Sequence, residues 1–127
     1  MDITRLAIDK DRAKASNQKV QVNFLVGDAL RLNEYFKEAF FNAVVDSGLF
    51  HSLDDEDRPV FASQIRRVLV NGGKYFMLCF SDKEPGSWGL RRVRKKEIQW
   101  IFSNVLRIDY VRDAFIATKD HKKAVKA

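Results

Sequence analysis

Short polar stretches follow two of the predicted strands in this sequence, and their residue types are suited to binding a ligand. Asp28 comes directly after an apolar stretch that ends at Gly27, and Asp46-Ser47-Gly48 follows the next apolar stretch. Carboxylates and hydroxyls accept hydrogen bonds, and sheets of parallel strands bind ligands at the carboxyl ends of their strands. The pattern therefore predicts where a pocket lies, without indicating its chemistry. Asp28 is explained equally well as a turn residue after Gly27.

Strand-like and helix-like stretches alternate along the chain and would position these residues. Strand-like stretches alternate apolar with polar residues or run continuously apolar; they cover residues 20–26, 43–45, 74–80 and 106–111. Helix-like stretches cover residues 4–16, with Thr4 as N-cap, then 33–40, a stretch between Ser52 and Asn71, and 94–103. This alternation predicts an α/β fold with a mainly parallel sheet and helices on its faces.

The helix that follows residue 52 has the clearest boundaries. Ser52 or Asp54 is expected to cap its start, and Pro59 falls in its early turns, where proline is tolerated. Gly72 and Gly73 are expected to end it, because glycine accepts a left-handed backbone conformation without strain. Its apolar stripe is formed by Phe61, Ile65, Val68 and Leu69.

Composition indicates one globular domain. The chain has 127 residues, of which 46% are hydrophobic, and its ten Phe residues bring large apolar area to a core. We expect a single domain over residues 1–118 and a basic tail over residues 119–127. The apolar runs are too short to span a membrane, and the first residues have no signal-like apolar core; we therefore expect a cytoplasmic protein.

The cysteine content and the charge distribution limit the chemistry. Cys79 is the single cysteine, it lies in an apolar run, and no histidine is near it in sequence, so neither a disulfide nor a zinc site is expected. The net charge of +6 is concentrated in residues 91–96 and in the C-terminal lysines. A basic surface can attract nucleic acid, but the aromatic interleaving of single-strand readers is absent, so we do not expect a nucleic-acid partner.

Four stretches in order resemble the middle of a class I S-adenosylmethionine-dependent methyltransferase. They begin at Asp2-Ile3-Thr4 and continue through FLVGDAL at residues 24–30, FNAVVDSGLFH at residues 41–51 and IRRVLVNGGKY at residues 65–75. The resemblance implies a Rossmann-like fold, incomplete relative to the family's seven strands, and S-adenosylmethionine as cofactor.

The resemblance also implies roles for individual residues. Asp2 would accept both hydroxyls of the cofactor ribose as a bidentate pair, although a residue at this position is also readily explained as a frayed terminus. Asp28 would accept from the adenine amino group, with the backbone of Ala29 beside it. Asp46 and Ser47 would lie where the sulfonium methyl group meets the acceptor.

Two further residues are candidates on the acceptor side. His51 would lie near the transferred methyl group and could act as a general base, since histidine titrates near neutral pH; the alternative is a loop histidine packed near Phe50. Trp88 could stack on a flat acceptor or on the cationic sulfonium; the alternative is a residue that anchors its loop.

The sequence departs from the family in two places. It has no Gly-x-Gly-x-Gly turn, because its adjacent glycines, Gly72-Gly73, come after a helix and before a strand. It also has no counterpart of the last, antiparallel strand. Unpaired strand edges favour association with another chain, so we expect self-association, together with weak or absent binding of S-adenosylmethionine.

Two functions remain open from the sequence. The first is a methyltransferase-like protein with a small-molecule acceptor, whose activity is expected to be weak or absent in this truncated form. The second is a non-catalytic dimerisation or binding module on the same scaffold. A cofactor that binds only the folded state would raise the melting temperature and so separate the two.

Overall fold

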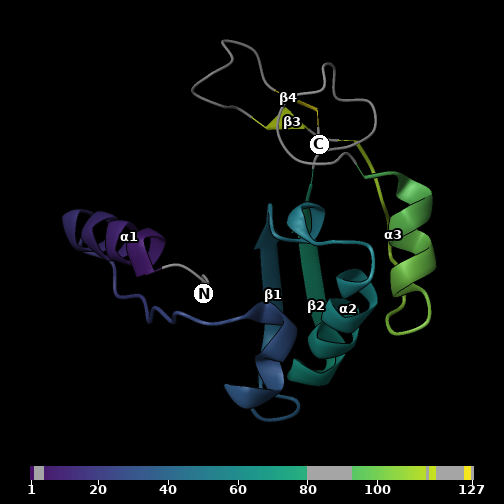
Figure 1. The fold of residues 1–127 in the computed structure, drawn as a ribbon, viewed down its shortest axis with the longest axis horizontal. Coiled ribbons are helices and arrows are strands. Elements are labelled where there is room, and N and C mark those ends of the chain that lie inside the picture. Colours follow the sequence, from purple (N-terminus) through teal and green to yellow (C-terminus); the bar gives the residue numbers. More distant parts are fainter. Residues whose placement is uncertain (2–4, 80–92, 114, 117–124, 127) are drawn as a thin grey trace.

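A parallel pair of strands forms the centre of the fold. The computed structural model describes residue 1, residues 5–79 and 93–113, and the backbone of residues 115–116 and 125–126. Strands β1 (Phe41–Ser47) and β2 (Leu69–Leu78) lie side by side, and helices α2 (Asp57–Val68) and α3 (Lys95–Phe102) lie beside β2 (Figure 1). This confirms the α/β class and the parallel pairing.

Helix α1 (Arg5–Asn17) lies apart from that layer, on the side of β1 that faces away from β2 (Figure 1). The helix predicted for residues 4–16 is confirmed, while Thr4, the expected N-cap, lies outside the described residues. Ile8 is buried, whereas Leu6 is 67% exposed. Most of the apolar surface of α1 is therefore not used for packing.

The strand predicted for residues 20–26 is wrong. The segment has no assigned helix or ladder, and only Val26 forms an isolated bridge. A strand is stabilised by hydrogen bonds to a neighbouring strand, and neither β1 nor β2 pairs with this segment. Val20 and Val22 are each 51% exposed as a result.

A 3-10 helix, η1 (Ala29–Glu34), takes the place of the short helix predicted for residues 33–40, so that prediction is wrong in position. The turn begins early because the Asp28 carboxylate accepts a hydrogen bond from the Leu30 N–H at 2.9 Å. The Asn33 N–H donates to the side chain of Gln64 on α2 and holds η1 against that helix.

Strands β1 and β2 pair in register from Ala43 opposite Lys74 to Ser47 opposite Leu78. Both predicted strands are confirmed as elements, although β1 is longer than expected. An irregularity separates Phe41 from Ala43 in the pairing, and Gly72 lies opposite it with a φ of +80°. Glycine adopts this left-handed conformation without strain.

Helix α2 confirms the best-defined prediction, with two corrections at its ends. No side-chain cap is present at its N-terminus, so the expected caps are wrong; instead the carbonyl of Asp54 accepts from the N–H groups of Asp57 and Arg58. At the other end β2 begins at Leu69, so the helix ends before Gly72-Gly73. Strand pairing with β1 stops the helix before the glycines are reached.

The core lies between the strands and the two helices. Rings of Phe61 on α2 and Phe102 on α3 both pack on Tyr75 of β2, with centroids 6.2 and 5.3 Å away. The buried cluster comprises Leu32, Phe50, Phe61, Ala62, Ile65, Val68, Leu69, Cys79, Val93 and Phe102. Both helices cover one face, and on the opposite face Val45 and Phe76 are exposed among the described residues.

The C-terminal part departs from the expected pattern. Helix α3 confirms the prediction for residues 94–103, but residues 106–111 form no strand, so that prediction is wrong. A short antiparallel pair, β3 (Phe115–Ile116) with β4 (Val125–Lys126), follows. Most of the predicted basic tail, residues 119–127, lies outside the described residues.

Across the residues described, we find no helix whose length and apolarity would let it cross a membrane.

Candidate functional site

The carboxylate of Asp46 organises the loop at the carboxyl end of β1. Its Oδ1 accepts from the Leu49 N–H at 2.8 Å, and its Oδ2 accepts from the Phe50 N–H at 3.1 Å. Oδ2 also accepts from the Tyr75 hydroxyl at 2.8 Å. Asp46 is only 5% exposed, so it joins β1, β2 and the following 3-10 turn, η2 (Phe50–Ser52), from within the protein.

The loop turns sharply at Gly48. Gly48 has a φ of +93°, and its N–H donates to the Leu78 carbonyl at 3.1 Å. A Cβ atom placed on Gly48 would lie 3.6 Å from Cε1 and Nε2 of His51, so the imidazole packs against the glycine. Ser47, in contrast, is exposed because strand alternation puts it on the face opposite Asp46.

His51 is buried, with 6% of its surface exposed. Arg58, which is fully buried, donates to its carbonyl at 3.4 Å and forms a 2.9 Å ion pair with Glu97 of α3. The guanidinium also lies 4.7 Å from the centroid of the Phe50 ring. Arg58 therefore ties α2, α3 and η2 together behind the loop.

Two groups near Asp46 have altered acidity. Burial, followed by the charge of Asp46 and its hydrogen bond, raises the pKa of the Tyr75 hydroxyl far above its ordinary value. Burial, followed by the charge of Asp46, raises the pKa of the Cys79 thiol to about 11. Both groups are therefore protonated at neutral pH, and the buried, free Cys79 behaves as an apolar side chain.

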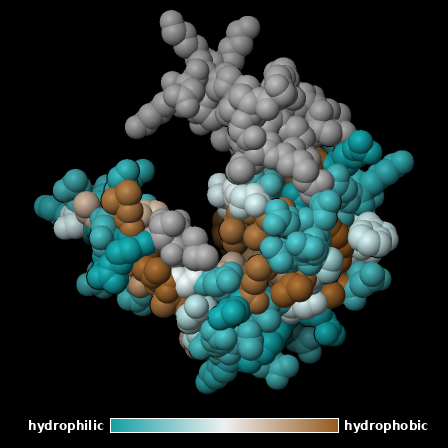
Figure 2. Space-filling view, viewed as in Figure 1, coloured by the Kyte–Doolittle hydropathy of each residue, from teal (hydrophilic) through white to brown (hydrophobic). Residues whose placement is uncertain are grey.

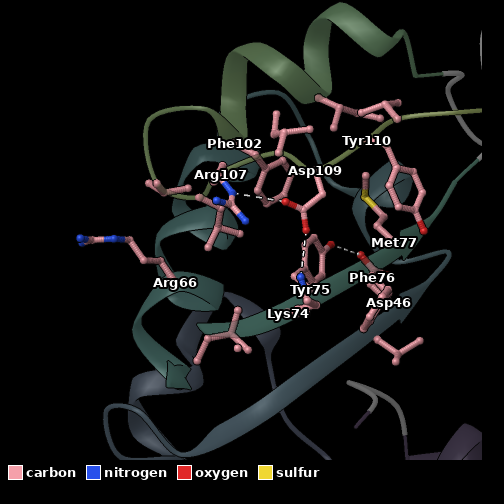
Figure 3. A pocket seen from close by; sticks show the side chains of 18 of the residues that line it. Asp46, Arg66, Lys74, Tyr75, Phe76, Met77, Phe102, Arg107, Asp109 and Tyr110 are labelled. Atoms are coloured by element: carbon pink, nitrogen blue, oxygen red, sulfur yellow. Dashed lines mark hydrogen bonds and ion pairs between the residues drawn. The ribbon is translucent and has the colours of Figure 1, made fainter. Parts of the chain in front are cut away.

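A large cavity opens beside β2, with a volume of about 1320 Å³. One side is formed by β2 and the other by residues 105–113, and Phe102 of α3 contributes to the wall. Figure 3 shows Lys74 and Asp109 pointing toward each other across it, 3.0 Å apart. Asp46 lies at its edge and its carboxylate faces the Tyr75 hydroxyl.

A second polar location lies at Asp28. Oδ1 of Asp28 accepts from Leu30, and its N–H donates to the Tyr35 hydroxyl at 3.3 Å. A Cβ atom placed on the preceding Gly27 would lie 2.6 Å from Cε of Met1 and 2.9 Å from Cζ of Tyr35. The first residue of the chain therefore contacts the Gly27-Asp28 turn.

The structure brings some of the predicted site residues together and separates others. Asp46, Ser47 and His51 share the loop after β1, whereas Asp28 and Ala29 form the separate location beside Met1. The large cavity is lined by Asp46 but by neither Asp28 nor Ala29. Asp2 and Trp88 lie outside the described residues. The proposed roles of all these residues remain predictions.

Sequence reasoning missed two side chains on which this region depends. Tyr75 is one of several aromatics in an alternating strand, and nothing in the sequence distinguishes it as the partner of Asp46. Arg58 stands in an acidic, exposed-looking helix start, but it is completely buried. No local pattern signals either role, since both partners come from distant parts of the chain.

None of the described residues forms a group of three or more His, Cys, Asp or Glu side chains placed to hold a metal ion.

Comparison with known proteins gives consistent results. The methyltransferase-domain family matches residues 1–73. An uncharacterized methyltransferase of Schizosaccharomyces pombe is 33% identical over 82 residues, which make up 65% of this chain and 55% of that protein. The chain thus spans little more than half the length of this relative.

Solved structures show the same fold at low identity. A SAM-dependent methyltransferase from Methanosarcina mazei superposes with a TM-score of 0.80 at 19% identity, covering 98% of this chain and 76% of that one. A protein solved in a study of the conversion of a disulfide bond into a thioacetal group during echinomycin biosynthesis gives a TM-score of 0.82 at 20% identity. That superposition covers 98% of this chain and 61% of the other.

Proposed function

This chain belongs to the class I methyltransferase family, and from that premise we propose that it is a methyltransferase-like domain that uses S-adenosylmethionine and has a small-molecule acceptor. A location in the cytoplasm is part of the same proposal. The family and the fold support the reaction class. The cofactor proposal rests on the side chains described above.

The contact between Met1 and Gly27 carries the cofactor proposal. It joins the start of the chain to the Asp28 turn, and these two segments supply the two carboxylates proposed for the adenosine part of the cofactor. Asp28 uses Oδ1 for Leu30, while Oδ2 has no hydrogen-bond partner among the described residues. An exocyclic amino group of adenine is a donor that this free oxygen can accept. Asp2 would bind the ribose hydroxyls.

Binding is proposed to be weak. The chain has no Gly-x-Gly-x-Gly stretch. In the family, the glycines of this stretch let the backbone come close to the methionine part of the cofactor, and these residues contain no equivalent. Of the residues that the resemblance places near the sulfonium methyl group, Asp46 already accepts hydrogen bonds within the protein through both carboxylate oxygens. Methyl transfer depends on holding the reacting atoms in line, and we therefore propose low activity for this chain.

Thermal unfolding with S-adenosylmethionine or S-adenosylhomocysteine tests the cofactor proposal. A ligand that binds only the folded state raises the melting temperature by an amount set by the ratio of concentration to Kd. We expect a rise that becomes measurable only at about 1 mM ligand. No rise at this concentration would contradict cofactor use by this chain, and a low-micromolar Kd by calorimetry would contradict weak binding.

Asp28→Asn provides the matched variant. Asparagine keeps one oxygen for the Leu30 N–H, so the η1 turn is retained, but its second polar atom is an amino group that cannot accept from adenine. We expect the unliganded melting temperature to stay the same while the ligand-induced rise is lost. An unchanged rise would show that Asp28 does not contact the cofactor.

On the acceptor side, His51 is proposed as the general base. It is the histidine of the loop after β1, which also carries the exposed Ser47, and its ring lies against Gly48. His51→Gln is expected to lower methyl transfer to acceptors that must lose a proton. Unchanged transfer by this variant would remove the base role.

A second candidate function is a non-catalytic module that self-associates. The open face of the sheet favours it, since Val45 is 74%, Phe76 49% and Leu78 43% exposed. Figure 2 shows hydrophobic side chains on the side of the body that faces α1. Both oxygens of the Asp46 carboxylate already accept hydrogen bonds within the protein, which also fits a structural role. Concentration-dependent association without a cofactor-induced rise in melting temperature would favour this function.

A further inference from the structure

The side chain of Tyr35, the residue that follows η1, lies beside the Gly27-Asp28 turn. Its hydroxyl oxygen accepts from the Asp28 N–H at 3.3 Å. A Cβ atom placed on Gly27 would lie 2.9 Å from Cζ and 3.1 Å from Cε2 of the tyrosine ring. The ring therefore packs directly on the backbone of Gly27, in space that the side chain of any other residue at this position would need.

The backbone that carries Tyr35 is held by the core. The Tyr35 N–H donates to the Leu32 carbonyl at 3.1 Å, and the side chain of Leu32 belongs to the buried cluster. The next residue, Phe36, donates to the same carbonyl, and its ring packs on Phe41 of β1 with centroids 4.8 Å apart. A group that is already held in place loses little freedom on binding a ligand. Tyr35 thus presents its hydroxyl from a preorganised position.

The Tyr35 hydroxyl still has a proton to donate. A phenol is both donor and acceptor, and its one hydrogen bond among the described residues uses the oxygen as acceptor. Tyr35 is 38% exposed, so a ligand can reach this group. Oδ2 of Asp28, whose own N–H contacts the hydroxyl, also has no partner within the described part of the chain. One available donor and one available acceptor therefore lie at the same turn.

Adenine presents the complement of this pair. Its exocyclic amino group donates, and the ring nitrogen beside it, N1 on one edge or N7 on the other, accepts. A 6-oxopurine has a carbonyl oxygen in place of the amino group. That oxygen would face the Asp28 carboxylate, and two acceptors without a proton between them repel each other. The turn therefore suits a 6-aminopurine and disfavours a 6-oxopurine.

We propose that Tyr35 is a specificity-determining residue of the adenine site. Its O–H donates to the ring nitrogen beside the amino group, while Oδ2 of Asp28 accepts from the amino group itself. The proposal rests on the cofactor use proposed above and extends it to a residue for which the resemblance implies no role. It also gives Gly27 a reason to be glycine, because a side chain there would displace the tyrosine ring.

Nucleoside titration tests the site without depending on methyl transfer. Adenosine added to the isotope-labelled chain should shift the amide NMR signals of residues 27–36 and give a Kd in the millimolar range. Inosine, which carries the 6-oxo group, should bind about tenfold more weakly or worse, because it leaves the Asp28 carboxylate facing an acceptor. Equal affinities for adenosine and inosine would overturn the proposed pair.

Tyr35→Phe isolates the hydroxyl, since the phenylalanine ring can still pack on Gly27. We expect this variant to fold and to raise the Kd for adenosine about three- to tenfold, the effect of one lost hydrogen bond. Tyr110→Phe is the matched control, because Tyr110 is 64% exposed and belongs to the wall of the large cavity. It should leave the Kd unchanged. A Tyr35→Phe chain that binds adenosine as tightly as the wild type would overturn the role of Tyr35.

Deaza analogues distinguish a direct contact from an indirect effect on Asp28. 1-Deazaadenosine and 7-deazaadenosine keep the amino group, and each lacks one ring nitrogen. The wild type should lose affinity for the analogue whose missing nitrogen meets the hydroxyl, and Tyr35→Phe should show no such loss, since the two changes remove the same contact. Equal losses in both proteins would assign the nitrogen to another donor, such as the backbone of Ala29, and overturn the direct contact. Unchanged wild-type affinity for both analogues would overturn it too.

S-adenosylhomocysteine separates this proposal from the cofactor proposal. If it binds the wild type and Tyr35→Phe with the same Kd, the role of Tyr35 fails while cofactor use stands. If neither it nor adenosine binds the wild type, both proposals fail.

Discussion

The hydroxyl of Tyr75 on β2 donates a 2.8 Å hydrogen bond to Oδ2 of Asp46 on β1. The same carboxylate accepts the backbone N–H groups of Leu49 and Phe50. One buried side chain thereby connects the two strands to the loop that carries Ser47 and His51. The positions of Ser47 and His51 therefore depend on hydrogen bonds of Asp46 that lie inside the protein.

Tyr75→Phe is expected to lower the free energy of unfolding by about 1–2 kcal/mol, because a partly buried hydrogen bond is lost while the ring is retained. Urea unfolding measures the difference. Tyr110→Phe is the matched control, since Tyr110 is 64% exposed, and it should change stability by less than about 0.5 kcal/mol. Equal effects of the two variants would show that the Asp46 contact is not stabilising.

Asp46→Asn should be more disruptive than Tyr75→Phe. An asparagine oxygen can accept from only part of the three donors that Asp46 now serves, and its amino group would face an N–H or a hydroxyl. We expect a loss of about 2–3 kcal/mol, measured by urea unfolding. Ser47→Ala, next to it on the exposed face, should be nearly neutral. A stable Asp46→Asn protein with unchanged amide exchange at Leu49 and Phe50 would contradict the capping role.

Arg58→Met is expected to cost about 3 kcal/mol, because it removes the 2.9 Å ion pair between the fully buried guanidinium and the partly buried Glu97. Arg66→Met on the same helix is the control. Arg66 is exposed, and this change should stay within about 0.5 kcal/mol. Combining Arg58→Met with Glu97→Gln should recover part of the loss, since the carboxylate that faced the guanidinium is then replaced by a neutral amide. No recovery in the double variant would mean that packing on Phe50, rather than the ion pair, accounts for the cost.

Cys79 should react slowly with thiol reagents. With its pKa raised to about 11 by burial and by Asp46, only about one thiol in a thousand is ionised at pH 8, whereas an unfolded thiol is substantially ionised there. We expect labelling by a disulfide reagent to be about a hundredfold slower in the folded chain than in urea. Equal rates would contradict the burial of Cys79.

The same shift predicts how stability depends on pH. The folded pKa lies above the unfolded one, so the contribution of Cys79 is fully present below about pH 8.5 and is lost as the pH rises toward 11. The urea midpoint should therefore fall over this range, and the fall should be smaller in Cys79→Ala. An identical pH dependence in the two proteins would show that other groups cause it.

Local patterns were sufficient for the three α-helices, although the short helix predicted for residues 33–40 was wrong in position. Residues 4–16, the stretch after Asp54 and residues 94–103 were predicted as helices, and α1, α2 and α3 occupy them. A helix satisfies its backbone groups within its own segment, so its position follows from nearby residues. The helix ends were less predictable, because β2 rather than Gly72-Gly73 terminates α2.

Strand formation depended on neighbours. Residues 20–26 and 106–111 alternate as clearly as β2 does, but within the described parts of the chain neither forms a strand, and only Val26 forms an isolated bridge. Residues 41–47 and 69–78 form strands because they pair with each other. Alternation indicates which face of a strand would be buried, but it does not supply a partner.

The order of residues by itself determined the helices, the α/β class and the family, because these depend on local spacing and on short motifs such as the one around Asp46. The tertiary structure alone decided that Asp46 would serve its own loop and Tyr75, and that His51 would be buried against Gly48. Each of these depends on groups far apart in the chain coming within hydrogen-bond distance. That distance is set by packing, which the sequence pattern does not encode locally.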